Sequence, residues 1–464
     1  MDGMSKRWLL AAAAVWAAGA AVAPAAEWHV KPEATAEGKG TLQEPWHLQA
    51  ALNHPPAVKP GDTIWVHQGE YPGRFQSQLQ GTREKPIVVR AAAGERATLR
   101  GGLVIGQNTP SQHTWYWGLE VSQRKLNGHL VDGVTISNLE GNTPGIKVIN
   151  CIIHDTGGVG VSTWGGAHDN EVNGCVIYNN GFDNPKDRGH GHGFYIQSRT
   201  GPKLIKDNVI FRNFSKGTQL YGSENAPRNN VTHEGNTVFN NSEISRVVGR
   251  QGSLASNKVN AMHIEGGQIA EKPNLIANMV YAPPWAKESI GNLMGNSSDA
   301  LIKGNYMVAL SPEPVVVFRL RGKNAGLKMV DNTFFGDPNG FAIDEYGPGN
   351  VRLAERPKEP KVFVRPNDYE KGRAHITIFN WPLKDKVEVD VKPAGLKEGQ
   401  LFELRDAQNF YGQPVLKGKF EGKPLAVPMT GLSVAPLEGL DEQYKTPEHT
   451  APEFGVFVLL PVGE

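Results

Sequence analysis

The sequence has few cysteines and no surplus of charge, and both features exclude classes of protein. Only Cys151 and Cys175 occur among 464 residues, so neither a disulfide framework nor a CxxC metal site is expected. The 48 Lys and Arg residues balance 47 Asp and Glu residues. No overall field therefore draws the chain to nucleic acid or to an anionic membrane, and partners must be recognised by local groups.

Long hydrophobic runs are missing beyond the N-terminus. Lys6 and Arg7 precede an apolar stretch at 8–23, which ends in the small-residue string APA at 23–25. This pattern is typical of a secretory signal peptide over residues 1–25. A membrane anchor would need about 20 apolar residues. We therefore expect a secreted or periplasmic protein without an integral membrane segment.

Amphipathic helical patterns are also lacking, and the chain instead repeats an asparagine before a short apolar run. The anchors are Asn150, Gly174, Asn208, Asn236, Asn257, Asn278, Asn305 and Asn332, at intervals of 24, 34, 28, 21, 21, 27 and 27 residues. Such units bury their apolar faces only when coils stack and each strand pairs with the next coil. The repeat predicts a right-handed parallel β-helix with asparagine amides hydrogen-bonded along the stack. Equivalent positions on neighbouring coils favour Cys151 and Cys175 as stacked free thiols.

The opening of this region carries a resemblance to a known group. The string KPGDTIWVHQGEYPGRF, followed by the coils, resembles the secreted pectate-lyase-like β-helix proteins of bacteria. The similarity extends over roughly residues 27 to 345 and implies a β-helix over 26–350 that handles carbohydrate. That fold carries lyases, hydrolases, epimerases and non-enzymes, so the reaction must be argued from the site.

The pattern changes after the Pro- and charge-rich connector RLAERPKEPK. Longer alternating segments such as VFVRP, AHITIFNW and KVEVDV predict an antiparallel β-sandwich over 356–464. The segment has no evident catalytic set, and we expect it to fold independently. It either binds sugar or covers the exposed end of the coil stack.

Aligning one strand from each coil separates an apolar inward set from a polar outward set. The outward positions are Ser162, Trp164, Tyr195, Gln197, Arg199, Gln219, Tyr221, His263, Glu265, Asn292, Arg319 and Arg321. Aromatic rings stack on sugars, amides bind hydroxyls, and guanidinium groups pair with uronate carboxylates. The alignment predicts a saccharide cleft here, unless the face is inert or covered by loops. The substrate-binding candidates are Trp164, Gln197, Arg199, Gln219, Glu265 and Arg321.

An insertion, GFDNPKDRGHGHG, enters this face just before Tyr195. Its His190 and His192 lack an HExxH motif or a tetrahedral ligand set, so no metal site is predicted. The segment GHGFYIQS resembles the GHG signature of polygalacturonases, with His192 at the matching histidine. The Asn-Thr-Asp and Asp-Asp motifs of those hydrolases are absent, which puts hydrolysis by that aspartate set in doubt.

A lyase fits the available groups better. Eliminative cleavage of a uronate polymer needs a cation at the carboxylate, a base for the carbon 5 proton and an acid for the departing oxygen. Arg319 or Arg199 can neutralise the carboxylate, and Tyr195 or Tyr221 can donate a proton to the departing oxygen. The catalytic candidates are His263, His192, Tyr195, Tyr221 and Arg319, with either histidine as the base.

Similar lyases often use calcium beside Lys or Arg, so calcium is the one cofactor that the resemblance allows. Glu265 with Asp183 or Asp187 can supply oxygen ligands. The preferred hypothesis is a monomeric, secreted polysaccharide lyase acting on an acidic glycan. A glycoside hydrolase using Glu265, Asp183 or Asp187 is the second hypothesis, and a non-catalytic carbohydrate-binding or structural β-helix is the third.

Overall fold

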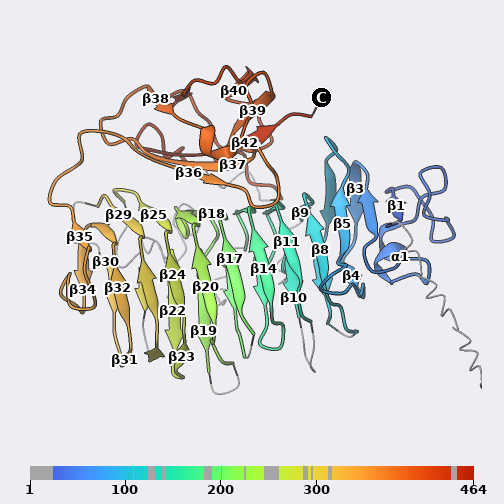
Figure 1. Ribbon diagram of the computed structural model, residues 1–464, viewed down its shortest axis with the longest axis horizontal. Coiled ribbons are helices and arrows are strands. Elements are labelled where there is room, and N and C mark those ends of the chain that lie inside the picture. Colours follow the sequence, from blue (N-terminus) through green and yellow to red (C-terminus); the bar gives the residue numbers. More distant parts are fainter. Residues whose placement is uncertain are drawn as a thin grey trace, which may run out of the picture.

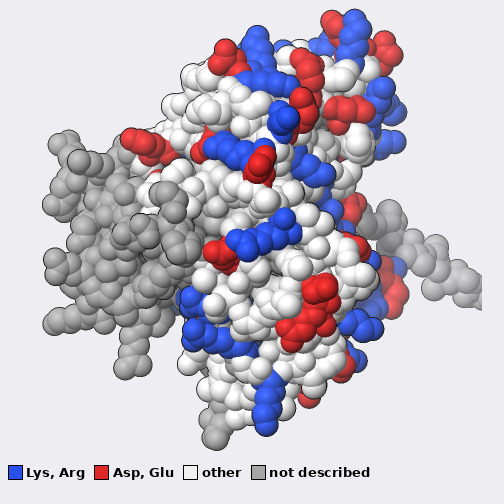
Figure 2. Space-filling model, turned by 90° about the vertical axis from the view of Figure 1, so that its left-hand side faces the viewer, with Lys and Arg blue, Asp and Glu red and all other residues white. Residues whose placement is uncertain are grey.

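In the computed structural model, most of the chain winds into stacked coils whose strands form three long parallel sheets (Figure 1). The structure describes residues 25–107, 109–123, 131–137, 143–181, 191–199, 201–223, 226–244, 261–285, 291–293, 296–311, 316–439 and 447–463. Within these ranges no helix is long and apolar enough to cross a membrane. Figure 2 looks at the left-hand end of Figure 1 and shows cationic and anionic side chains interspersed.

Apart from the first and last, each coil contributes one strand to each of three sheets, A, B and C. Sheet A contains β1 (Glu27–Val30), β2 (Thr63–Val66), β5 (Ile87–Ala91), β8 (Thr114–Trp117), β11 (Lys147–Ile149), β14 (Asn170–Asn173), β17 (Lys203–Lys206), β20 (Val231–Glu234), β24 (Asn274–Ile276), β28 (Leu301–Lys303) and β32 (Lys328–Val330). Sheet B contains β3 (Gly69–Pro72), β6 (Ala97–Arg100), β9 (Glu120–Ser122), β12 (Ile152–His154), β15 (Val176–Tyr178), β18 (Val209–Phe211), β21 (Thr237–Phe239), β25 (Met279–Ala282), β29 (Tyr306–Ala309), β33 (Thr333–Phe335) and β35 (Val351–Arg352).

Sheet C contains β4 (Phe75–Ser77), β7 (Leu103–Ile105), β10 (Val134–Ile136), β13 (Val161–Thr163), β16 (Phe194–Ile196), β19 (Thr218–Gly222), β22 (Met262–Gly266), β26 (Gly291–Leu293), β30 (Val316–Leu320) and β34 (Asp337–Asn339). A small sheet adds β23 (Ala270–Glu271), β27 (Ser297–Ser298) and β31 (Asn324–Ala325). Helix α1 (Leu48–Leu52) packs apolar side chains against the core near the N-terminal end. The predicted parallel β-helix is confirmed.

Asparagine side chains form a ladder between sheets A and B, as the sequence predicts. Asn208, Asn236, Asn278 and Asn305 each donate from Nδ2 to the Oδ1 of the next rung at 3.0, 3.0, 3.0 and 2.8 Å. Asn332 continues the ladder by donating to Asn350 Oδ1 at 2.8 Å. The ladder satisfies amides that would otherwise be buried without partners.

Two anchors of the repeat were wrong. Cys151 and Cys175, not Asn150 and Gly174, precede the paired β12 and β15 strands as Asn208 precedes β18. Asn150 and Gly174 lie one residue earlier, with φ of 53° and 68°, where the turn needs left-handed backbone.

A third anchor, Asn257, lies outside the described residues. The ladder passes directly from Asn236 to Asn278. Both cysteines are buried and free, as expected for stacked thiols.

The C-terminal strands form an antiparallel β-sandwich. One sheet orders β36 (Lys361–Pro366), β37 (Ala374–Phe379), β42 (Phe454–Pro461), β39 (Leu401–Asp406) and β40 (Leu416–Lys419), and the other pairs β38 (Lys386–Val389) with β41 (Leu425–Pro428). Short 3-10 turns, η1 (Lys392–Ala394) and η2 (Ala407–Asn409), lie between strands. An apolar cluster that includes Ile376, Val389, Leu404 and Val427 fills the space between the sheets.

This sandwich lies along the side of the stack, above β18, β25 and β29 in Figure 1, and not over its end. Outward side chains of sheet B form one apolar cluster with it. Tyr281 stacks on Phe454 with ring centroids 4.3 Å apart, and Phe239 meets Phe454 edge-on at 5.1 Å. The expectation of a cap on the end of the stack was therefore wrong.

A buried charge network extends this contact toward the N-terminal coils. His154 lies 2.6 Å from Asp155 and 2.9 Å from Glu120. The sandwich side contributes Tyr411, whose ring lies 3.6 Å under the Arg96 guanidinium. Burial alone would lower the pKa of His154, but hydrogen bonds and charges from Asp155 and Glu120 outweigh it and raise the pKa to about 9.

Candidate functional site on sheet C

The outward residues of sheet C form two columns, and strand pairing gives their order. The first column is Ser162, Tyr195, Gln219, His263, Asn292 and Arg319. The second lies two residues further along each strand and pairs Tyr221 directly with Glu265. The inward residues between them, such as Phe194, Leu220 and Ile264, are buried. The predicted alignment is confirmed for Tyr195, Gln219 and His263. The coil of Ser162 is shifted by two residues from that alignment, because Ser162 pairs with Tyr195 and not with Gln197. The chemical roles of the residues stay predictions.

A histidine, a carboxylate and a lysine meet near the middle of these columns. His263 and Glu265 share a face of β22, and His263 Nδ1 lies 2.7 Å from Glu265 Oε1. Lys216, just before β19, donates from Nζ to Glu265 Oε2 at 2.8 Å. The carboxylate accepting at Nδ1 leaves Nε2 as the basic nitrogen of a neutral imidazole.

Burial and charge set the protonation of this group. Desolvation lowers the pKa of His263 to about 4, with Lys216 and Arg319 adding to the fall and Glu265 opposing it. Burial alone would raise the pKa of Glu265, but His263 and Lys216 outweigh it and hold that pKa well below its usual range. At neutral pH the imidazole is therefore uncharged and the carboxylate ionised.

His263 departs from the expectation of an exposed outward side chain, because only 4% of it is accessible. It lies between Gln219 and Asn292 in the first column. Its replacement should therefore disturb packing, which the sequence argument did not foresee.

Guanidinium groups line the same face without carboxylate partners in the described part of the chain. Arg199 and Arg321 are exposed, and Arg319 is half-buried. The Nε of Arg319 is buried and has no acceptor among the described residues. A hydrogen bond from a buried cationic donor is strongest when the acceptor is an anion. The end of the column that carries Arg319 therefore suits the carboxylate of a ligand.

Aromatic groups cluster at the other end of the columns. Trp164 and Tyr195 have ring centroids 5.6 Å apart, and Gln197 Nε2 donates to the Tyr195 hydroxyl at 3.2 Å. Trp164 and Tyr221 are 38% and 41% exposed, which is high for such large rings. His192 is buried, and its ring lies 6.2 Å from that of Tyr195.

Two lysines of this site were not predicted from the sequence. Lys216 is a single lysine before a strand, and its sequence context marks no role. Lys203 is fully buried below this face and donates from Nζ to Thr163 Oγ1, Trp164 O and Gln197 O at 2.7, 2.7 and 2.6 Å. It fixes the strand ends that carry Trp164 and Gln197. The sequence signal for Lys203 is a lysine at an inward position of β17, where an apolar residue is expected.

Metal ligands are not grouped on the described residues: no cluster of three or more His, Cys, Asp or Glu side chains suited to a metal ion occurs among them. Asp183, Asp187 and His190, the insertion residues considered as ligands, lie outside the described residues.

Comparison with known proteins bears on this fold directly. Residues 28–258 match the family described as Pel9A-like, right handed beta helix region. This segment is therefore similar to that family of right-handed β-helices. No curated protein matches the chain.

Solved structures resemble this chain as well. Pectate lyase Pel9A is 16% identical with a TM-score of 0.47, over 71% of this chain and 82% of that one. An alginate lyase from Paenibacillus sp. str. FPU-7 is 18% identical with a TM-score of 0.44, over 71% and 98%. A glycoside hydrolase is 10% identical with a TM-score of 0.42, over 70% and 99%. Identities this low concern the fold, and the reaction is argued from the site.

Proposed function

We propose that this protein is a polysaccharide lyase that cleaves a uronate-containing glycan by β-elimination on the outward face of sheet C. One observation carries the proposal. Guanidinium groups that have no carboxylate partner among the described residues, above all Arg319, lie on the same face as a neutral imidazole that an ionised carboxylate orients. A cation for the substrate carboxylate and a base beside it are the two groups that elimination needs first.

The steps follow from those groups. Arg319 binds the uronate carboxylate and stabilises the charge that develops when the proton on carbon 5 leaves. His263 Nε2 accepts that proton while Glu265 holds Nδ1–H. The bond from carbon 4 to the glycosidic oxygen breaks, a double bond forms between carbons 4 and 5, and Tyr221 or Tyr195 donates a proton to the departing oxygen.

A hydrolase would need a different carboxyl group. Glycosidases use one carboxyl group as a protonated acid beside a second carboxylate. Glu265 is held ionised by His263 and Lys216, so it is poorly suited to donate a proton. This argument favours elimination over hydrolysis on the described part of the face.

The test is incubation of the full chain with acidic and neutral polysaccharides, reading ultraviolet absorbance and reducing ends together. A new absorbance from the unsaturated product, lost in His263→Ala, is the expected result. Reducing ends without absorbance would assign a glycoside hydrolase instead. Retained binding with neither signal would assign a non-catalytic carbohydrate-binding protein.

A further inference from the structure

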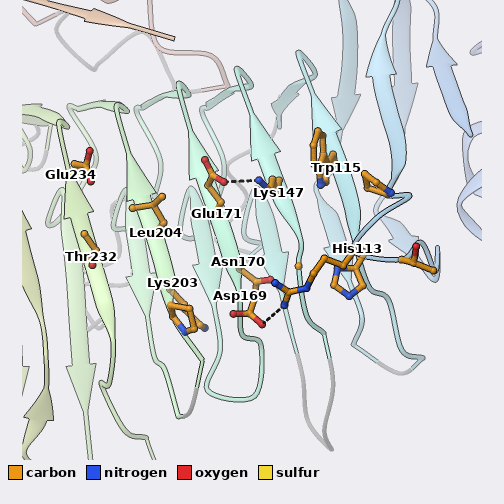
Figure 3. Close-up of a pocket in the computed structure, with 15 residues that line it drawn as sticks. His113, Trp115, Lys147, Asp169, Asn170, Glu171, Lys203, Leu204, Thr232 and Glu234 are labelled. Atoms are coloured by element: carbon orange, nitrogen blue, oxygen red, sulfur yellow. Dashed lines mark hydrogen bonds and ion pairs between the residues drawn. The ribbon is translucent and has the colours of Figure 1, made fainter. Parts of the chain in front are cut away.

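A groove lies on the outward face of sheet A, a different side of the β-helix from the sheet C columns. Its volume is about 580 Å³, within the range of about 300–1,000 Å³ typical of ligand sites. Its floor is a row of directly paired positions on five neighbouring strands (Figure 3): Trp115, Lys147, Glu171, Leu204 and Thr232. We call this hollow the sheet A groove.

The sandwich braces one side of the sheet A groove. Tyr369 accepts from Lys147 Nζ at 2.8 Å and donates to Glu171 Oε2 at 2.6 Å. The Tyr369 ring stands edge-on to Trp115 with centroids 5.9 Å apart. These contacts hold the floor side chains in place, so a ligand would meet a preformed surface.

Apart from Lys203, the charged side chains that line the sheet A groove each have an opposite charge close by. The pairs are Lys147 with Glu171 at 2.9 Å, Arg83 with Asp169 at 3.4 Å, and Glu234 with Lys206 at 3.7 Å. Lys203, also in the lining, commits its ammonium to three inward oxygens. Among the described residues that line the groove, every cation thus already has a partner, which weakens its attraction for an anionic sugar.

Uncharged hydrogen-bonding groups complete the lining. Asn170 is 4% exposed; its Oδ1 accepts from Ile146 N at 2.9 Å, and its Nδ2 has no acceptor among the described residues. Burial, with the charge of Arg83, lowers the pKa of His113, so this imidazole is neutral near pH 7. Amide and imidazole groups of this kind pair with hydroxyls.

We propose that the sheet A groove binds an uncharged stretch of glycan, independently of the chemistry on sheet C. Trp115 supplies a ring for a sugar to stack on, and Leu204 gives the floor an apolar centre. Strands about 4.8 Å apart make a five-strand floor long enough for a short oligosaccharide. A uronate would instead face Glu171 and Glu234, whose neighbouring cations are already paired with them. The groove would hold the enzyme on neutral regions of a mixed polymer.

Affinity electrophoresis tests this inference with the full chain carrying His263→Ala, so that acidic glycans stay intact. Gels contain a neutral glycan (galactan, xyloglucan or arabinoxylan) or an acidic one (polygalacturonate or alginate). At least one neutral glycan should retard the protein. Trp115→Ala should weaken that retardation about five- to tenfold. Leu204→Arg, which fills the centre of the groove from an outward position, should abolish it.

Trp65→Ala is the matched control, because Trp65 is a half-buried tryptophan of sheet A outside the groove. Absence of retardation by all three neutral glycans, or equal loss in Trp65→Ala, would overturn the inference. A dimer that Leu204→Arg disrupts would assign the groove to a second copy of the chain and overturn it too. Turnover of soluble acidic oligosaccharides, measured with His263 intact, should not change in the groove variants. A negative lyase assay would leave this test unaffected.

Discussion

His263 and Glu265 lie two residues apart on one strand, and their side chains meet at 2.7 Å on the outward face of sheet C. The carboxylate of Glu265 both orients the imidazole and raises its pKa. Its removal should therefore change turnover through the first effect and the pH dependence of turnover through the second.

Glu265→Gln should lower turnover by about tenfold or more, since the imidazole loses its orienting acceptor. Loss of the negative charge lowers the pKa of His263 below its value of about 4. The acid limb of the pH-rate profile should therefore move to lower pH. Glu271→Gln, at an exposed acid on β23, should change neither quantity. An acid limb that moves upward would contradict the assignment of His263 as the base.

Arg319→Ala should raise KM for an acidic substrate about ten- to a hundredfold, because a charge-assisted hydrogen bond of about 1.5–3 kcal/mol is lost. Arg319→Lys should restore only part of the affinity, since an ammonium cannot form the two-pronged pair. Lys303→Ala removes a positive charge from an exposed position of sheet A and controls for net charge. An equal KM in Arg319→Ala and Lys303→Ala would exclude direct binding.

Phe454→Ala should reduce the free energy of unfolding by about 3–5 kcal/mol, as expected for a fully buried phenylalanine. The ring packs between Tyr281 and Phe379 across the contact of the sandwich with sheet B. Leu401→Ala, at an exposed site in the sandwich, should have little effect in denaturant titrations.

Deletion from residue 356 tests the same contact. It should leave an insoluble β-helix with its sheet B aromatics exposed. A soluble truncated chain with the melting temperature of the full protein would show that the contact stabilises little.

The His154 network should make stability fall at alkaline pH. The pKa of His154 is about 9 in the folded chain and about 6.5 when unfolded. Its stabilising contribution is therefore complete below pH 6.5 and is lost as pH rises to 9. At pH 6 the His154→Gln variant should melt at a lower temperature than the wild type. Between pH 6.5 and 9 its melting temperature should fall by less than that of the wild type. His168→Gln should keep the wild-type slope, and an identical slope in His154→Gln would refute this linkage.

The sequence predicted sheet C well because its strands alternate apolar and polar residues, which fixes the register of Tyr195, Gln219 and His263. It misplaced the rungs at Asn150 and Gly174, which lie in left-handed turns, because cysteines and not asparagines hold the equivalent positions one residue later. Strands of sheet B such as VIF at 209–211 are apolar at both inward and outward positions. This pattern indicates a sheet that is covered on both faces, and it could have predicted the contact with the sandwich.

Other features had no sequence signal. The burial of His263 depends on side chains from neighbouring coils, and the contact of Lys216 with Glu265 joins residues 49 positions apart.

The position of the sandwich also bears on how the molecule comes apart. A stack of coils whose contacts are only between neighbours can fray from either end, one coil at a time. Here a single second body touches the coils of β12, β18, β21, β25 and β29 together. Loss of any one of them opens a gap under the sandwich. We therefore expect these coils and the sandwich to unfold in one cooperative transition, with gradual fraying confined to the N-terminal coils.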